Sequence, residues 1–332
     1  MDGTGHGSVA TGIVDRKNKR KLREPLPKGE RFFHRLGKDM RYNTMLYLLM
    51  LPGLAYYLIF NYAPMYGIII AFKSYTPGMS IFGSPWVGFK YFADFFNSYY
   101  FERLLRNTFL LSFYSLLWGF PVPIIFALLL NELRSRKFMR VAQTFTYVPH
   151  FISIMVVCSL IMSFSAERGI FNDIIAFFGG GRSSILQNPK AFRSVYIASG
   201  IWQEAGWGSI LYLAALSGIN KELFDAADID GAGRFQKIWN ITLPGIAPTV
   251  TIMLILRMGG LMSVGFEKVL LLYNDLTMET ADVISTFIYR RGLIQADFAY
   301  SSAVGLFNSV INCLFLVGAN KLSSKISENS LW

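Results

Sequence analysis

Two charged residues lie inside long apolar stretches of this sequence: Glu204 in residues 195–216 and Arg257 in residues 246–272. If these stretches cross a membrane, an unpaired charge near the middle of either one costs several kcal/mol of insertion free energy. In one arrangement the two residues face each other across antiparallel helices and form a structural ion pair. In another, at least one of them lines a polar cavity and contacts a ligand. A free Arg257 would then suit a carboxylated ligand, whereas a paired one says little about ligand charge.

Amide and aromatic side chains form a second set of candidates. Asn308 and Asn312 stand one helical turn apart in residues 301–319, on the same side as Gly305. Amides can donate to and accept from hydroxyl groups, but small and polar residues also hold membrane helices together. Trp202 and Tyr212 could stack on a ring-shaped ligand or simply pack in the protein. The sequence leaves these alternatives open.

The elements that must position these residues are membrane helices. Hydrophobic residues make up 53% of the 332 residues and charged residues 16%, against about 25% charged residues in soluble domains. Six apolar stretches approach or exceed the roughly 20 residues that a helix needs to cross a bilayer. Pro52 and Pro64 predict a kink in the first of them. The sequence therefore predicts an all-α integral membrane protein with six transmembrane helices, over residues 45–72, 104–130, 141–164, 195–216, 246–272 and 301–319.

Positive charge predicts the orientation of these helices. The net charge of +11 is concentrated in residues 1–40 and in the loop 134–140, and positive charge is retained on the cytoplasmic side. Both termini are therefore expected in the cytoplasm. The predicted organisation is a basic, partly disordered tail over 1–40, a transmembrane domain over 41–320 and a cytoplasmic tail over 321–332. The basic tail suits anionic membrane lipid, and this clustered distribution argues against nucleic acid as a partner.

The loop between the fourth and fifth stretches, residues 217–245, is expected to carry a short helix of its own. Asn220 can cap a helix that starts at Lys221, because its side-chain oxygen can accept a bond from a free backbone N–H. Gly231 and Gly233 are expected to end that helix. A face of apolar and small residues allows another protein's backbone to approach closely, so this loop is a docking surface rather than a catalytic one. The face and its acidic edges comprise Leu223, Phe224 and Ala227, with Glu222, Asp225 and Asp228.

This loop resembles the cytoplasmic signature of permease subunits of binding-protein-dependent ABC importers. The signature is an acidic residue, two alanines, three residues, glycine, nine residues, isoleucine, one residue and leucine-proline. The family usually has Glu at the first position, where this chain has Asp. The matching residues are Asp225, Ala226, Ala227, Gly231, Ile241, Leu243 and Pro244.

Other segments resemble particular branches of that family. Asp230, followed by Gly231 and Ala232, is similar to the carbohydrate-uptake branch, which includes the maltose-transporter type. A subgroup that serves complex-polysaccharide utilisation is similar in several further segments. These are residues 265–274, 279–284, 303–310 and 330–332, and the whole resemblance covers about residues 42–332.

The resemblance implies a type I ABC importer permease in the bacterial cytoplasmic (inner) membrane, with 217–245 as its ATPase-coupling loop. In such importers, ATP-driven closure of two ATPase subunits, a homodimer or a heterodimer, moves the docking helices and turns the spans from inward-open to outward-open. An extracytoplasmic solute-binding protein then releases sugar into a path formed with a second, homologous permease subunit. This chain has no GxxxxGK[ST] phosphate loop. ATP and Mg²⁺ are therefore expected in the partner ATPases, and no cofactor is expected in this chain.

The resemblance favours an oligosaccharide substrate, with an acidic one of the alginate or pectin type as one option. An ion-coupled secondary sugar transporter is the alternative, although the two halves show no convincing internal repeat. No paired-carboxylate, His-rich or Ser-His-Asp constellation points to an enzyme. Catalytic and metal-binding residues are not expected, and Cys158 and Cys313 fall inside apolar stretches. The candidate residues of the translocation path are Glu204, Arg257, Asn308, Asn312, Trp202 and Tyr212.

Overall fold

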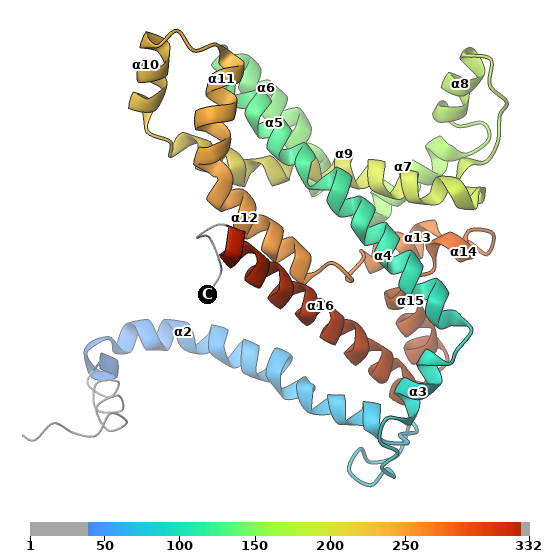
Figure 1. The fold of residues 1–332 in the computed structure, drawn as a ribbon. Coiled ribbons are helices and arrows are strands. Elements are labelled where there is room, and N and C mark those ends of the chain that lie inside the picture. The colour runs from blue at the N-terminus through green and yellow to red at the C-terminus, as the bar shows by residue number, and fades with distance from the viewer. Residues whose placement is uncertain (1–38, 327–332) are drawn as a thin grey trace, which may run out of the picture. The chain divides into compact units, whose positions relative to one another are not determined.

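The computed structural model describes residues 39–326, and the described chain is helical, with one isolated bridge between Lys73 and Trp86 (Figure 1). The chain divides into two units, residues 1–65 and residues 66–332. Most of the predicted N-terminal tail and the last six residues lie outside the described residues. The predicted division into tails and a transmembrane domain stays a prediction.

The described part of the first unit is one apolar helix whose geometry changes along its length. It begins as α2 (Thr44–Tyr57), continues as the π-helical turn η1 (Leu58–Tyr62) and passes into the 3-10 helix η2 (Ala63–Phe72), which runs into the second unit. Pro52 lies within α2, and Pro64 is the second residue of η2. A proline has no backbone N–H to donate, so regular α-helical bonding is interrupted near it.

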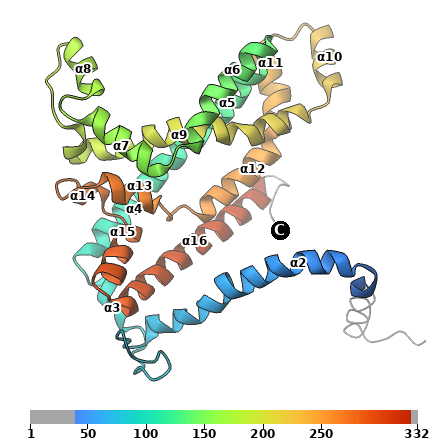
Figure 2. The same ribbon diagram turned by 180° about the vertical axis from the view of Figure 1, so that it is seen from behind.

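The second unit contains the remaining described helices (Figures 1 and 2). In order they are α3 (Lys90–Phe96), α4 (Tyr100–Gly119), α5 (Pro121–Asn131), α6 (Arg136–Tyr147), η3 (Val148–Phe151), α7 (Ile154–Ser165), α8 (Ile170–Phe177), η4 (Ile185–Gln187), α9 (Pro189–Ser217), α10 (Lys221–Ile229), α11 (Arg234–Lys237), η5 (Ile238–Thr242), α12 (Leu243–Gly259), α13 (Phe266–Leu272), α14 (Met278–Ala281), α15 (Ile284–Tyr289), η6 (Arg290–Ile294) and α16 (Phe298–Ile326).

Five helical segments of the described chain are long and apolar enough to cross a membrane: Thr44–Phe72, Tyr100–Asn131, Ile154–Phe177, Arg234–Gly259 and Phe298–Lys325. Helix α9 has 29 residues, which is also long enough, but Gln203, Glu204 and several glycines and serines make it less apolar. The predicted all-α membrane architecture is confirmed. The count of six and the orientation of the termini stay predictions.

The third and fifth predicted stretches are each interrupted by a break that changes the direction of the chain. The third, residues 141–164, is broken between α6 and α7, where Pro149 lies in η3 and the Ser153 hydroxyl caps α7 by accepting a bond from Val156 N (3.4 Å). The fifth, residues 246–272, ends as a helix at Gly259, and Gly260 follows as its C-cap. Consecutive glycines favour this break because glycine pays the largest backbone entropy cost in a helix.

Helix α9 is the central element of the second unit. It crosses α5 and packs against α4, α6 and α12 (Figures 1 and 2). At the α6 crossing, a Cβ on Gly206 would collide with the Thr146 carbonyl, so the absence of a side chain permits this close approach. Helices α12 and α16 lie side by side, and α10 and α11 stand at the opposite end of the unit from α13, α14 and α15.

Candidate functional site

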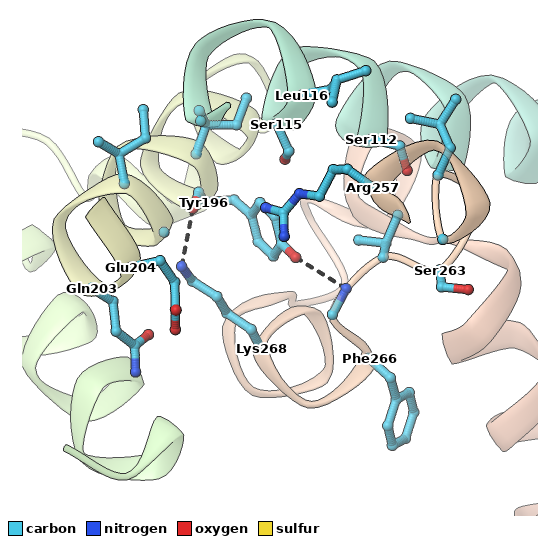
Figure 3. Close-up of a pocket in the computed structure, with 18 of the residues that line it drawn as sticks. Ser112, Ser115, Leu116, Tyr196, Gln203, Glu204, Arg257, Ser263, Phe266 and Lys268 are labelled. Carbon is cyan, nitrogen blue, oxygen red and sulfur yellow. Dashed lines mark hydrogen bonds between the residues drawn. The ribbon is translucent and has the colours of Figure 1, made fainter. Parts of the chain in front are cut away.

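A cavity of about 890 Å³ lies between α4, α9, α12 and α13 (Figure 3). Such a volume is within the range of small-molecule binding sites, about 300–1,000 Å³. Serines, aromatic rings and charges of both signs line it. The polar lining comprises Ser112 and Ser115 from α4, Tyr196, Gln203 and Glu204 from α9, Arg257 from α12, Ser263 from the following loop, and Glu267 and Lys268 from α13.

Glu204 lies at the middle of α9 and contributes to this cavity. Its Oε2 is 3.0 Å from Nδ1 of His150, and the His150 ring stacks on Trp207 with centroids 4.5 Å apart. The ion pairs of the described residues do not include one between Glu204 and Arg257. The predicted pair is therefore replaced by a contact with η3, since the break after α6 brings His150 beside α9.

Arg257 is not near the middle of a helix, as the uninterrupted fifth stretch would require. Because α12 ends at Gly259, Arg257 lies in its last turn. A positive charge there is stabilised by the partial negative charge of the helix C-terminus, by about 0.3–1 kcal/mol when exposed. The side chain is exposed to the cavity and forms no hydrogen bond or ion pair with another described residue.

Lys268 is a functional candidate that the sequence prediction missed. Its side chain is only 7% exposed, and its Nζ donates to the Tyr196 carbonyl at 3.1 Å. The same Nζ lies 4.9 Å from the centroid of the Tyr196 ring, and the Tyr196 hydroxyl accepts a bond from Gly265 N at 3.2 Å. Tyr196 thereby connects α9 to the segment between α12 and α13 (Figure 3). A lysine inside the fifth apolar stretch was the available signal.

The other four predicted path residues do not line this cavity. Asn312 joins α16 to the segment that follows α12: its Oδ1 accepts from Met262 N (2.8 Å) and its Nδ2 donates to Ser263 Oγ (3.0 Å). Tyr212 is 4% exposed and packs beside Ile246, whereas Trp202 is 50% exposed. Asn308 is partly buried, and its Oδ1 has no hydrogen-bond partner among the described residues. Asn312 and Tyr212 thus make structural contacts, and a role for any of the four in transport stays a prediction.

The predicted docking helix is present as α10. Asn220 caps it as expected, because its Oδ1 accepts a bond from Glu222 N at 3.0 Å. The helix ends at Ile229, and Gly231 follows with a φ of +72°, a conformation that glycine adopts without strain. Gly233 instead begins α11 as its N-cap. Asp228 forms an ion pair with Lys237, which ties α10 to α11.

Apolar side chains in and around α10 are exposed on the surface of this chain. Leu223 is 53% exposed and Ile229 is 87% exposed. Phe235 and Trp239, which follow in α11 and η5, are 88% and 74% exposed, and the sequence prediction did not include them. Exposed apolar residues on a capped helix, such as Leu223 and Ile229, are typical of a protein–protein contact, whereas Phe235 and Trp239 lie in the segment Arg234–Gly259, which is apolar enough to cross a membrane.

The other end of the signature anchors the loop. Ile241 lies in η5, and Leu243 and Pro244 begin α12. Leu243 packs with Ile246, Leu216 and Ile219 in a cluster that joins α5, α9 and α12. The segment that carries α10 is therefore connected at both ends to this one cluster. A displacement of α10 would act on α9 and α12, which line the cavity.

A double-mutant cycle tests the contact between His150 and Glu204. We expect the His150→Ala and Glu204→Ala variants to be non-additive in thermal stability, with a coupling of about 0.5–1 kcal/mol because Glu204 is half-exposed and screened by solvent. The Glu204→Ala and Arg257→Ala variants serve as the control and should be additive within about 0.5 kcal/mol. Additivity in the first cycle with coupling in the second would contradict the structure.

No group of three or more His, Cys, Asp or Glu side chains that could hold a metal ion occurs among residues 39–326. Both cysteines are free thiols; Cys158 is buried and Cys313 is exposed.

The sequence of this chain matches a known protein family and several known proteins. Residues 119–327 match the family described as "Binding-protein-dependent transport system inner membrane component". Protein LplB of Bacillus subtilis (strain 168) is 45% identical over 294 residues, which cover 88% of this chain and 92% of that protein. The polygalacturonan/rhamnogalacturonan transport system permease protein YteP of the same organism is 44% identical over 288 residues, 86% of this chain and 90% of its own length.

Two solved structures are similar to this chain in both fold and sequence. One is a bacterial ABC transporter involved in the import of the acidic polysaccharide alginate. Its matching chain has a TM-score of 0.82 and 44% identity, covering 88% of this chain and 99% of that one. The other is a bacterial alginate ABC transporter in complex with an alginate pentasaccharide-bound periplasmic protein, with a TM-score of 0.83 and 43% identity over 90% of this chain and all of that one.

Proposed function

Because this chain belongs to the inner membrane components of binding-protein-dependent transport systems, we propose that it is a permease subunit importing an acidic oligosaccharide at the expense of ATP. The family is one of transport permeases, not of enzymes. The ATP-driven part of the proposal is supported by α10. This helix is capped, has exposed apolar residues, and is connected at both ends to the packed cluster that joins α5, α9 and α12.

Energy enters through α10 in this proposal. A partner ATPase subunit binds the α10 surface, and a second ATPase acts on the second permease subunit. Closure of the two ATPases, which bind ATP and Mg²⁺, moves α10 together with the beginnings of α12 and the end of α9. Because Glu204 and Arg257 lie farther along these helices, that movement reaches the cavity.

The oligosaccharide part of the proposal is supported by the relatives and by the polar cavity. YteP is named for polygalacturonan and rhamnogalacturonan, and both similar structures are named for alginate. All three names specify uronate-containing chains. An extracytoplasmic binding protein delivers the sugar, and the second permease subunit completes the path around the cavity. Charges of both signs in its lining suit a ligand with carboxylates and many hydroxyls.

Reconstitution tests this function. The chain is purified with its second permease and ATPases, placed in proteoliposomes and supplied with a binding protein loaded with oligogalacturonate or oligoalginate. We expect uptake that requires ATP and the binding protein and persists when ionophores collapse the ion gradients. Uptake that ignores ATP and stops with the ionophore would instead identify an ion-coupled transporter.

A further inference from the structure

We propose that Arg257 and Lys268 together form the site at which a carboxylate of the sugar chain binds in the cavity. This inference rests on the proposed function and deepens it, because it names the residues that recognise the acidic group. Both side chains line the cavity, from the last turn of α12 and from α13. Figure 3 shows both side chains beside Tyr196 in the lining of the cavity.

Arg257 provides donors that no described residue uses. Its guanidinium carries five N–H groups in a planar fork that matches a carboxylate in a bidentate arrangement. The side chain is exposed to the cavity, and Glu204, the carboxylate at the middle of α9, contacts His150 instead. The structure therefore leaves the fork directed at the cavity, where a carboxylate of the ligand can accept from it.

Lys268 brings a buried charge to the same place. Its side chain is 7% exposed, and the Tyr196 carbonyl is its one hydrogen-bond acceptor among the described residues. Glu204 acts on this ammonium group through its charge but forms no hydrogen bond with it, and a buried ammonium group with three donors is costly without a bonded anionic partner. The carboxylate of a ligand would supply that partner, so binding would offset a cost already present in the protein.

Two acidic residues, Glu204 and Glu267, also line the cavity. Glu204 is engaged by His150 at 3.0 Å. Glu267 is exposed in the first turn of α13 and forms no ion pair with another described residue. Neither of them is bonded to Arg257 or Lys268, so they do not occupy the donors of the two cations. Their oxygens are left to accept bonds from sugar hydroxyls.

The test compares an acidic ligand with a neutral one of the same length. Oligogalacturonate and its carboxyl-reduced form are loaded on the binding protein, and uptake into proteoliposomes is divided by the amount of loaded binding protein. We expect Arg257→Gln and Lys268→Gln each to lower uptake of the acidic chain by about tenfold, the size of one charged hydrogen-bonded contact, while uptake of the reduced chain stays within about twofold. Arg257→Lys should fall between wild type and Arg257→Gln.

Lys90→Gln is the matched control, because Lys90 is an exposed cation on α3 outside the cavity. It should leave uptake of both chains unchanged. Equal losses for both chains in Arg257→Gln and Lys268→Gln, or no loss, would overturn the carboxylate site while leaving the proposed function intact. A wild-type complex that imports the reduced chain but not the acidic one would overturn the acidic substrate itself.

Discussion

A tryptophan at Gly231 is expected to abolish ATP-driven uptake while the protein remains in the membrane. The φ of Gly231 is +72°, and a Cβ built there meets no atom within 4 Å. The new side chain would therefore begin in open space, on the side where the proposed ATPase would dock. The backbone strain of a left-handed residue, about 1–2 kcal/mol, is matched by a control variant at another glycine of positive φ. The loss would thus report on docking rather than on folding.

The measurement is ATP-dependent uptake alongside the amount of protein recovered in the membrane. Gly78→Trp is a matched control, because Gly78 also has a positive φ (+96°) and open space around its Cβ position. Gly78 lies between η2 and α3, away from the coupling segment. The Gly78→Trp variant should keep uptake near the wild-type level. Wild-type uptake by Gly231→Trp would refute docking at this loop.

Removal of the Asp282 carboxylate is expected to destabilise the protein by about 3 kcal/mol, because it leaves two partly buried arginines without their anionic partner. Asp282 is fully buried between α14 and α15. Its oxygens accept from Arg290 at 2.8 and 3.1 Å, from Arg103 of α4 at 3.3 Å and from Thr286 at 2.9 Å. Burial alone would lower the pKa of Arg290, but hydrogen bonds and charge from Asp282 outweigh it and raise that pKa above its usual range.

The same network reaches α9 through an asparagine. Asn107 of α4 donates to the Asp282 carbonyl at 3.1 Å and accepts from Arg193 of α9 at 2.9 Å. The melting temperature of the purified complex should therefore be much lower for Asp282→Asn than for the wild type. Asp275→Asn is the control, since Asp275 is exposed on the same segment and forms no ion pair among the described residues. Equal melting temperatures for the two variants would show that the network adds no net stability.

Several parts of the fold and of the docking surface follow from local sequence alone. Asn220 caps α10 and Gly231 follows its end because both effects depend only on neighbouring backbone groups. The apolar stretches predict membrane helices because transfer into lipid depends on composition over about 20 residues. The family signature lies within one continuous loop, so its spacing is visible without knowledge of the fold.

The cavity required information that a linear pattern does not contain. Sequence patterns place Glu204 and Arg257 at similar depths, but whether two helices present those residues to each other depends on how they are rotated and crossed. The breaks at Pro149 and at Gly259–Gly260 change both. The break at Pro149 brings His150 beside Glu204. The break at Gly259–Gly260 places Arg257 at a helix end and allows Lys268 to line the cavity.

The sequence by itself thus determined the class of protein and the position of the short helix α10, because each depends on composition or on bonds between near neighbours. The tertiary structure alone decided which charges meet. Arg103 and Asp282 are 179 positions apart, and His150 and Glu204 are 54 apart. Contacts at such separations are set by helix packing, in which a shift of one residue along a helix turns its side chains by about 100°.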